Sequence, residues 1–505
     1  MSAIAILTTA ELRAVEERAI TGPSLMERAG RAVADCARRM AADTGAPILV
    51  VAGPGNNGGD AWVAAALLAE SFHRVIVYDV TGSAPKAPEA RSARDRFATR
   101  GGQVVREWPS LEPALIVDGL LGIGLTRNVE APLSGAIERM NASGVPILSI
   151  DVPSGLDSDT GVARGAAVRA TRTITFIGHK VGLLTGDGLD CRGALELDDL
   201  GSLGAFVSRG TLLTPEVASA WLGARPANSH KGDFGSLAVI GGNRGMVGAA
   251  LLAARAGLLC GAGKVRAGLL SPEAPAVDFA HPELMLGTVD DAMAADVIVA
   301  GPGAGQSPSA TSVSMFERTV LPALINSAKP IVLDADALNA VAFNATLESD
   351  LAARSKGATI LTPHPGEAAR LLHQDNDKVN GDRLAAALAL ARRFNANVVL
   401  KGAGSICASP DGSWAINTTG NPGLASGGSG DVLAGMVGAM LAQALEPSRA
   451  LRYAVCLHGA AADACVARGN GPAGLTASEV ALEARVVLNE WARYPMAKPT
   501  PESAA

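Results

Sequence analysis

The strongest chemical signal in this 505-residue chain is a glycine- and serine-rich run that leads into an apolar helix. Residues 421–435 read NPGLASGGSGDVLAG, with Asp431 in the first turn of the predicted helix. Backbone N–H groups at such a turn bind anions, and the helix dipole adds to their attraction. A carboxylate there is badly placed to bind phosphate, but it can take the proton of a hydroxyl group that attacks phosphate. We therefore interpret the run as an anion site with Asp431 as its base, rather than as a simple helix cap.

Other motifs in the same half follow or precede predicted strands. The loop KGAGS (401–405) combines small residues with one cation, which suits a nucleotide phosphate. The sequence GxxxxGK[ST] occurs nowhere, so this is not a P-loop. The remaining motifs are HKGDFG (230–235), GGNRGMVGAA (241–250), GPGAG (301–305), DADALN (334–339) and TPHPGE (362–367).

Three loops in the first half also combine acids with flexible backbone. GPGNNGGD (53–60) contains GxGxxG, and Asp79 follows Gly58 by 21 positions, which formally matches a dinucleotide fingerprint. Its polar core of two amides and a carboxylate exceeds what one helix cap needs. The other two loops are DGLLGIGLTRN (118–128) and SIDVPSGLD (149–157).

These three loops should meet, because the carboxyl ends of parallel strands lie at one edge of an open α/β sheet. Carboxylates, amides and a hydroxyl gathered there suit a small hard cation and a polar ligand. Any one of the three aspartates can be read as a helix cap, and the convergence of all three favours a site.

Short apolar runs that alternate with helical stretches must position the loops. Such alternation indicates βαβ units and open parallel sheets. The pattern weakens between Cys191 and Leu213, where we place the join between two α/β domains. We predict strands over 48–52, 75–78, 115–117, 147–150, 173–176, 237–240, 297–300, 331–333, 359–361 and 398–400, and helices over 8–20, 24–42 and 61–70.

Composition excludes several classes of protein. The 43 Lys+Arg and 49 Asp+Glu residues give a net charge of −6, which argues against a nucleic-acid or membrane partner. The six cysteines are scattered without a CxxC pair, as expected of reduced, buried thiols in a cytoplasmic protein. Neither a signal peptide nor an apolar run long enough to span a membrane is evident, so we expect a soluble chain. The 58 glycines point to many places where the backbone approaches something closely.

The motifs NNGGD, DGLLGIGLTR, SIDVPSGLD and IGHKVGLLTG (177–186) resemble the NAD(P)H-hydrate epimerase family. The resemblance implies a Rossmann-like three-layer α/β sandwich that interconverts the R and S hydrates of NADH and NADPH. It implies a potassium ion on Asn57, Asp118 and Ser154. Asp151 would contact the substrate near the reacting carbon, where proton transfer needs an acid/base group. The implied substrate-binding residues are Asn56, Asn57, Gly58, Gly59, Asp60, Gly122, Ile123, Gly124, Leu125, Thr126, Arg127, Asn128 and Asp151.

The motifs of the second half resemble the ADP-dependent NAD(P)H-hydrate dehydratase family, within the ribokinase-like superfamily, across nearly all of residues 225–490. The resemblance implies that Asp431 deprotonates the C6 hydroxyl, that ADP phosphorylates it, and that phosphate leaves to regenerate NAD(P)H. Magnesium would bridge the nucleotide phosphates. The implied nucleotide-binding residues are Lys401, Gly402, Ala403, Gly404, Ser405 and Gly430, and the implied substrate-binding residues are Ala250, Gly303, Gly305, His364 and Asp431.

The leading interpretation is a bifunctional repair enzyme. Residues 1–213 would form the epimerase domain, 214–494 the ribokinase-like dehydratase domain, and 495–505 a disordered tail. We expect a homo-oligomer that binds hydrated dinucleotide and ADP. One alternative is a sugar or vitamin-precursor kinase fused to a dinucleotide-sensing domain. Another is a binding protein with a catalytically dead second half, against which the intact Asp431 loop argues.

Overall fold

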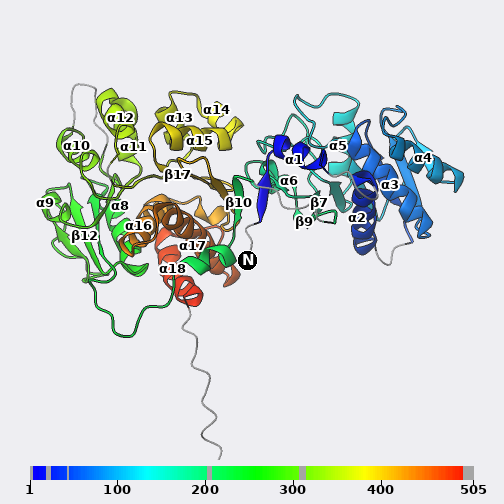
Figure 1. Cartoon of the computed structure of the whole chain (residues 1–505). Helices are drawn as coiled ribbons and strands as arrows, with labels where there is room; N and C mark the ends of the chain where they lie inside the picture. The colour runs from blue at the N-terminus through cyan, green and yellow to red at the C-terminus, as the bar shows by residue number, and fades with distance from the viewer. Residues whose placement is uncertain are drawn as a thin grey trace, which may run out of the picture. The chain divides into compact units, whose positions relative to one another are not determined.

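The computed structural model describes residues 4–18, 24–41, 45–201, 208–305, 314–355 and 357–492. The chain divides into two compact units, Ile4–Thr211 and Leu212 onwards (Figure 1). The predicted tail 495–505 and the last residues of the helices predicted over 8–20 and 24–42 lie outside the described residues.

An open, fully parallel sheet forms the centre of the N-terminal unit. Its strands run β4, β3, β2, β5, β6, β7, β9 across the sheet, so chain order reverses between β2 and β5. Such a reversal is the topological switch point at which ligands bind in doubly wound folds. The strands are β2 (Ile48–Ala52), β3 (Val75–Asp79), β4 (Gln103–Val105), β5 (Leu115–Gly119), β6 (Ile147–Ile150), β7 (Arg172–Phe176) and β9 (Ala194–Asp198).

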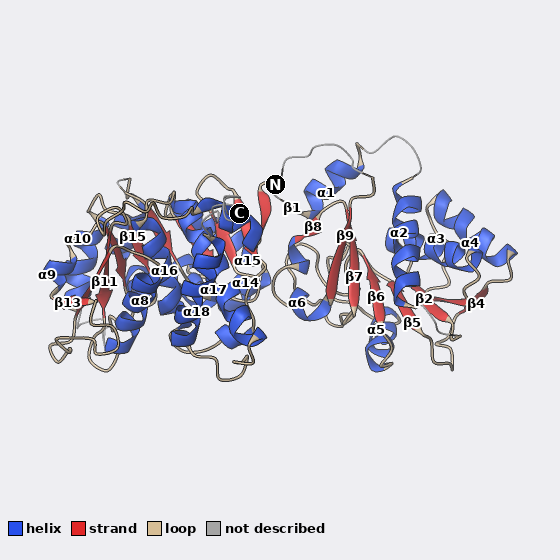
Figure 2. Ribbon diagram, turned by 90° about the horizontal axis from the view of Figure 1, so that it is seen from below, coloured by secondary structure: helices blue, strands red, loops and turns tan. Residues whose placement is uncertain are grey.

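Helices cover both faces of this sheet, which makes three layers (Figure 2). Ile48 and Val50 of β2 pack with α2, α3 and α4, whereas Leu49 and Val51 pack with α5, as the alternation of strand side chains requires. Strands buried on both faces read as continuous apolar runs, which is why sequence finds them. The helices are α1 (Thr9–Glu16), α2 (Leu25–Met40), α3 (Asn56–Glu70), α4 (Pro88–Thr99), α5 (Leu133–Ala142) and α6 (Gly188–Cys191), with a 3-10 turn over Val181–Leu183.

Two features of this unit differ from the sequence prediction. Helix α3 begins at Asn56 instead of residue 61, so the NNGGD run forms its first turns. Strand β9 lies in the region that the sequence analysis interpreted as a domain join. Its residues are partly exposed, and acidic residues alternate with leucines, so the strand lacks a continuous apolar run. Strand β1 (Ala5–Leu7) pairs antiparallel with β10 (Gly210–Leu213) and parallel with β8 (His179–Lys180).

The C-terminal unit repeats the same principle. Its strands run β13, β12, β11, β14, β15, β16, β17 in parallel, with a switch point between β11 and β14, and β18 and β19 follow antiparallel. The strands are β11 (Ser236–Gly241), β12 (Lys264–Leu269), β13 (Met285–Gly287), β14 (Val297–Ala300), β15 (Ile331–Leu333), β16 (Thr359–Leu361), β17 (Asn397–Leu400), β18 (Ile406–Ala408) and β19 (Trp414–Asn417). All ten predicted strands of the two units are confirmed.

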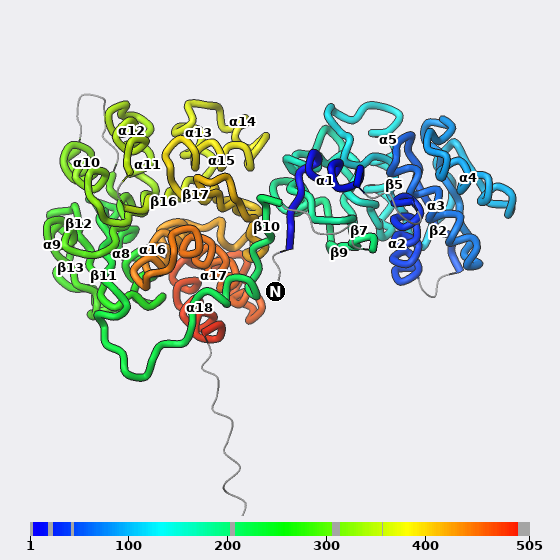
Figure 3. The backbone as a smooth tube through the Cα atoms, in the orientation of Figure 1, coloured from blue at the N-terminus to red at the C-terminus, as the bar shows by residue number. Residues whose placement is uncertain are grey.

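Helices α8, α16, α17 and α18 pack together on one face of this second sheet. The green loop over residues 222–235 leads into β11 and is followed most easily in Figure 3. The helices are α7 (Pro215–Ala218), α8 (Val247–Leu259), α9 (Val289–Ala292), α10 (Leu321–Ile325), α11 (Asp336–Phe343), α12 (Ala345–Ala352), α13 (Pro365–Leu372), α14 (Asn376–Gly381), α15 (Arg383–Arg393), α16 (Ser429–Ala442), α17 (Pro447–Ala467) and α18 (Ala477–Trp491), with shorter turns over Ser219–Trp221, Phe316–Val320 and Pro422–Leu424.

All six cysteines are buried, as expected, and none forms a disulfide. Among the described residues, no helix is both long and apolar enough to cross a membrane.

The contact between α8 and α16 depends on a missing side chain. A Cβ built on Gly435 would lie 2.0 Å from the Ala253 carbonyl oxygen, a backbone atom that cannot rotate away. We expect Gly435→Ala to lower the free energy of unfolding of the C-terminal unit by about 1–3 kcal/mol, because the two helices must separate. Urea unfolding of the whole chain, fitted with a transition for each unit, measures the change.

The matched control is Gly248→Ala on α8, where an added Cβ meets nothing within 4 Å. Its effect should be within about 0.5 kcal/mol, or slightly stabilising. Equal losses in the two variants would contradict the packing argument.

Candidate active sites

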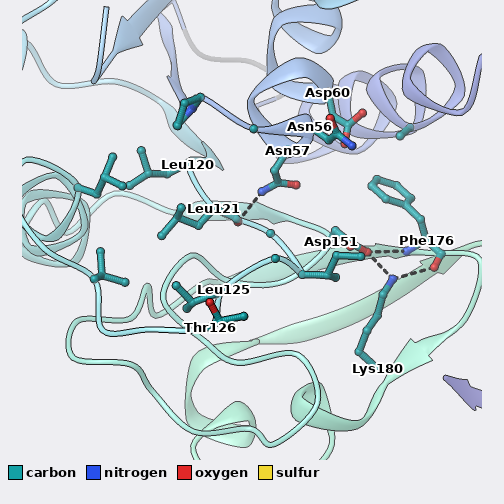
Figure 4. A pocket seen from close by; sticks show the side chains of 18 of the residues that line it. Asn56, Asn57, Asp60, Leu120, Leu121, Leu125, Thr126, Asp151, Phe176 and Lys180 are labelled. Carbon is teal, nitrogen blue, oxygen red and sulfur yellow. Dashed lines mark hydrogen bonds and ion pairs between the residues drawn. The ribbon is translucent and has the colours of Figure 1, made fainter. Parts of the chain in front are cut away.

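A cavity of about 730 Å³ opens at the carboxyl ends of β2 and β5 in the N-terminal unit (Figure 4). It therefore lies at the switch point, where the sequence placed a polar site. Gly58 and Gly59 are not in its wall; they are buried in α3, and a Cβ on Gly58 would lie 1.9 Å from the Gly53 carbonyl oxygen. The predicted site residues that do line the cavity are Asn56, Asn57, Asp60, Gly122, Ile123, Gly124, Leu125, Thr126, Arg127, Asn128 and Asp151.

Asp151 is held at the cavity wall in a rare backbone conformation. Its φ is 61°, a left-handed value that costs a non-glycine residue about 1–2 kcal/mol. Its Oδ1 accepts hydrogen bonds from the Thr175 hydroxyl and the Phe176 N–H, both at 3.2 Å, and forms an ion pair with Lys180. Strain that the surroundings enforce so strongly is typical of functional positions.

Lys180, which the sequence analysis did not single out, is fully buried beside Asp151 (Figure 4). Its ammonium donates to Asp151, to the Thr175 hydroxyl at 2.9 Å and to the Phe176 carbonyl at 2.8 Å. All three N–H groups are thus satisfied, as a buried charge requires. The signal that could have found it is a single lysine within the otherwise apolar HKVGLL stretch.

Two further carboxyl groups, those of Asp60 and Glu16, line the same cavity. Burial raises the pKa of Asp60 well above its usual range, and the charges of Asp151 and Glu16 raise it further. Burial and then Asp151 likewise raise the pKa of Glu16, which lies at the end of α1 and was not predicted. Burial and like charges therefore favour the protonated form of Asp60, whereas Asp151 has the buried ammonium as its partner.

Asn57, Asp118 and Ser154 meet behind the loop that follows β5. The buried Asp118 carboxylate accepts from the Ser154 hydroxyl at 2.5 Å and N–H at 2.9 Å, from the Ser149 hydroxyl at 2.8 Å and from the Leu120 N–H at 3.3 Å. Burial raises the pKa of Asp118, against the lowering effect of these hydrogen bonds. Asn57 Nδ2 donates to the Leu121 carbonyl at 2.7 Å, and the Ser154 hydroxyl accepts from the Leu121 N–H at 2.8 Å. The structure thus gathers the three residues around one loop.

In the C-terminal unit, the loops after β11 and β14 are joined by backbone hydrogen bonds. Gly242 N–H donates to the Pro302 carbonyl at 2.9 Å, and Asn243 N–H donates to the Gly303 carbonyl at 2.7 Å. Gly303 and Gly305 have φ values of 60° and 82°, which favour glycine. A Cβ on Gly242 would lie 3.0 Å from the Cβ of Ala250. Ala250, a predicted substrate-binding residue, therefore packs against the loop that follows β11.

Helix α16 begins inside the glycine- and serine-rich run. Gly428 precedes it with φ 86°, and the first backbone hydrogen bond of the helix joins the Val432 N–H to the Gly428 carbonyl at 3.0 Å. The N–H groups of Gly430 and Asp431 at its first turn are therefore available to a ligand. This geometry is that of an anion-binding helix start.

An ion pair between Lys401 and Asp334 lies at the same turn. Lys401 Nζ is 2.9 Å from Asp334 Oδ1, which also accepts from the Thr362 hydroxyl at 2.8 Å. Burial raises the pKa of Asp431 to about 7, and Asp334 contributes next, while Lys401 opposes the shift. Burial also raises the pKa of Glu367 to about 7, and Lys401 again opposes the shift. Lys401 therefore lies among the carboxyl groups of Asp334, Glu367 and Asp431.

His364 starts α13 and caps it. Its Nδ1 accepts from the N–H groups of Gly366 at 3.0 Å and Glu367 at 3.4 Å, while Glu367 Oε2 accepts from the His364 N–H at 2.8 Å. Burial, and then the charge of Lys401, lowers the pKa of His364. Because Nδ1 accepts hydrogen bonds, it carries no proton, and the neutral ring has its N–H at Nε2. That nitrogen lies 3.4 Å from Glu367 Oε1.

The HKGDFG motif (230–235) lies apart from the loops that follow the strands of the C-terminal unit. It immediately precedes β11, and a Cβ on Gly263, just before β12, would lie 1.8 Å from the Lys231 carbonyl oxygen. The motif is therefore at the amino ends of these strands, opposite the edge that carries the other loops. His230 and Asp233 form an exposed ion pair there at 3.2 Å.

Two doubly wound α/β units, each with acidic groups and close-packed glycine loops at its switch point, define a two-domain enzyme of nucleotide chemistry. The family models agree: YjeF-related protein N-terminus matches residues 22–182, and a carbohydrate-kinase-type model described as NAD(P)H-hydrate dehydratase matches residues 237–482.

Similar proteins extend along the whole chain. It is 38% identical to the bifunctional NAD(P)H-hydrate repair enzyme of Escherichia coli, over 95% of this chain and 92% of that protein. It is 36% identical to the enzyme of that name in Coxiella burnetii, over 88% and 90%. The chain belongs to the family of bifunctional NAD(P)H-hydrate repair enzymes.

A solved structure also resembles part of the chain. An ADP/ATP-dependent NAD(P)H-hydrate dehydratase from Bacillus subtilis, co-crystallised with ATP and Mg²⁺, is 30% identical over 55% of this chain and 98% of that one, with a TM-score of 0.46.

The pKa of Asp431 predicts a pH-dependent effect on stability. The pKa of this carboxyl is 3.8 in the unfolded chain and about 7 in the folded chain. The group therefore stabilises the fold fully below pH about 4, and this stabilisation is lost as the pH rises towards 7. At pH 8 the buried charge is a cost that Asp431→Asn removes. We expect the variant's Tm, relative to the native chain, to be higher at pH 8 than at pH 5.

The matched control is Asp350→Asn on α12, which changes the net charge equally at a position away from both sites. Thermal unfolding of all three chains at both pH values measures the difference. A Tm difference for Asp431→Asn that is the same at pH 5 and pH 8 would contradict the buried-charge argument.

Proposed function

We propose that this chain repairs hydrated NADH and NADPH in two steps. The N-terminal unit epimerises the R hydrate to the S hydrate. The C-terminal unit dehydrates the S hydrate with ADP and releases NAD(P)H, AMP and phosphate. The observation that carries the proposal is that one chain has acidic groups beside the carboxyl ends of the strands in each of two parallel sheets, Asp151 in the first and Asp431 in the second.

Inversion at C6 requires a bond of the hemiaminal carbon to break and to re-form on the other face, with a proton removed and returned. Asp151 is the proposed base, because it lines the cavity and its orientation is fixed by Thr175, Phe176 and Lys180. Asp60 is the proposed proton donor, because burial raises its pKa well above the usual range. Two carboxyl groups with different proton affinities in one cavity fit an acid/base pair.

Dehydration begins with phosphorylation of the C6 hydroxyl in this proposal. Asp431 accepts the hydroxyl proton, the oxygen attacks the terminal phosphorus of ADP, and AMP leaves. The C6–O bond then breaks and phosphate departs, and this phosphate takes the proton from C5, which leaves the double bond of NAD(P)H. The free N–H groups at the start of α16 and the Lys401 ammonium are placed to bind the phosphoryl oxygens.

Magnesium would enter with the nucleotide. Among the described residues, no three His, Cys, Asp or Glu side chains form a group able to hold a metal ion. The phosphates of ADP would therefore supply the principal ligands. When bound, the ion neutralises charge on the transferred phosphoryl group.

A potassium ion in the N-terminal unit fits the donors present. Asn57 and Ser154 supply oxygen atoms, and within the described chain no Lys or Arg forms an ion pair with the buried Asp118. A buried carboxylate without a basic partner favours a cation nearby. The four hydrogen bonds that Asp118 accepts orient it, and its charge is what the ion would compensate.

Potassium binding predicts an ion-specific gain in stability. A ligand bound only by the folded chain stabilises it by about 2.7 kcal/mol at one hundred times its Kd. We expect KCl to raise the Tm of the native chain more than an equal concentration of choline chloride. Asp118→Asn should lose this difference, whereas the control Asp350→Asn should keep it. Equal effects of the two salts on the native chain would contradict a potassium site.

One assay tests the main proposal. The chain is incubated with mixed R and S hydrates of NADH, ADP and Mg²⁺, and NADH absorbance is followed. Asp431→Asn should reduce the rate of recovery by a factor of about 10² or more, the usual contribution of a general base. Asp151→Asn should recover the S fraction quickly and the R fraction only at the spontaneous rate of epimerisation.

Asp350→Asn is the control and should behave as the native chain. No return of NADH with the native chain would refute the repair function. If the Asp151 variant matches the native chain on the mixture, Asp151 has no role in epimerisation.

Three finer points also remain part of this proposal. The catalytic domains would be residues 1–213 and 214–494, supported by the division of the compact units between Thr211 and Leu212. The resemblance to the two families supports a homo-oligomer, and the unpaired buried cysteines support a cytoplasmic location.

A further inference from the structure

Asp334 is a fully buried carboxylate to which the proposed reaction assigns no role. It follows β15, is 1% exposed, and accepts hydrogen bonds from Lys401 at 2.9 Å and from the Thr362 hydroxyl at 2.8 Å. Its own N–H donates to the Ala300 carbonyl at 3.1 Å. The residues that follow β16 and β17 therefore hold the side chain, and the end of β14 holds its backbone.

The pair of Asp334 and Lys401 lies directly against the first turn of α16. A Cβ built on Gly430 would lie 3.1 Å from Lys401 Nζ and 3.8 Å from Asp334 Oδ2. Gly430 thus leaves room for the ammonium beside the N–H groups that bind anions. Asp334 is the one acceptor that the described residues offer Lys401 Nζ, so two of its three N–H groups remain for a ligand.

We propose that Asp334 is the positioning residue of the dehydratase site: it anchors the Lys401 ammonium at the start of α16, where that ammonium binds a nucleotide phosphate and faces Asp431. The inference rests on the proposed dehydratase function and extends it, because it assigns the anchoring of the cation to a residue outside the glycine loops. Lysine side chains have several rotatable bonds, and a buried anchor removes the cost of ordering one for a phosphate contact.

The same anchor bears on Asp431. Asp334 is a negative charge near that carboxylate and raises its pKa, which favours the protonated form of Asp431. Loss of the Asp334 charge should therefore favour the ionised form. The charged groups that act on Asp431 are Asp334, Lys401, Asp336 and Glu367. The titratable and charged groups farther out, near Lys401 and His364, are His364, Arg370, Arg383 and His458.

The experiment compares Asp334→Asn with Asp350→Asn in the full chain, using purified S hydrate of NADH, ADP and Mg²⁺. Asparagine keeps the shape and one acceptor oxygen, so Thr362 keeps its partner. We expect the KM for ADP to rise about tenfold or more, the typical effect of a lost charge-assisted hydrogen bond. We also expect the acidic limb of the kcat/KM profile to move to lower pH, since that profile reports the free enzyme's base.

Asp334→Glu provides a second test that does not depend on the asparagine variant folding. It restores the charge with a longer side chain, so the acidic limb should return towards its native position while the KM for ADP stays raised. Circular dichroism and epimerase activity of the N-terminal unit check each preparation.

The possible results distinguish a failure of the dehydratase function from a failure of the positioning role of Asp334. If the native chain does not regenerate NADH from the S hydrate, the proposed function fails. If the native chain does so and Asp334→Asn has the KM for ADP and the pH profile of Asp350→Asn, only the positioning role fails. A loss of kcat in Asp334→Asn with neither a change in KM nor a shift of the profile would also overturn the positioning role.

Discussion

One backbone contact recurs at the centre of both units, and each site depends on it. At each switch point, the glycine that ends or follows the first strand meets a carbonyl oxygen of the loop after the neighbouring strand. A Cβ on Gly53 would lie 1.8 Å from the Leu120 carbonyl oxygen, and one on Gly241 would lie 2.1 Å from that of Pro302. Any side chain at these positions would push the two loops apart. Close approach of these loops is what brings residues from different strands into one site.

The same close packing sets the electrostatics. Loops without side chains leave little room for water, so the carboxyl groups that project among them are desolvated and hold their protons more tightly. Burial is the first cause of the raised pKa of Asp60 in one unit and of Asp431 in the other. A lysine lies in each site: Lys180 pairs with Asp151 in the first, and Lys401 pairs with Asp334 beside Asp431 in the second. Each unit thus has buried carboxyl groups and a lysine ammonium in the same site.

The sequence predicts the fold well where burial makes strands uniformly apolar. Strands such as 48–52 and 297–300 appear as predicted because both of their faces are covered. It fails for β9, whose exposed residues break that pattern. It also starts α3 too late, because asparagine and glycine disfavour helices, whereas the packing of Gly58 against Gly53 favours one.

The site residues divide along similar lines. Loop motifs with unusual polar content, such as NNGGD and GGSGD, stand out in the sequence, and in the structure they lie beside the residues that follow the strands. Glu16 and Lys180 reach the first cavity from segments distant in the chain, and local patterns carry no sign of such long-range contacts. The ion pair of Asp334 with Lys401 joins two motifs that the sequence shows separately, and only the order of strands β15, β16 and β17 brings them together.

The burial of Lys180 also has a consequence for chemical selectivity. Opening the ring of a hydrated nicotinamide exposes an aldehyde, and a lysine amine with a free electron pair condenses readily with aldehydes. Lys180 has no free pair while its three N–H groups are donated to Asp151, Thr175 and Phe176. If the hydrate binds in this cavity as proposed, Lys180 would supply positive charge beside a reactive carbonyl compound without becoming its target. The same hydrogen bonds that fix Asp151 would then protect the chain from covalent capture of its own substrate.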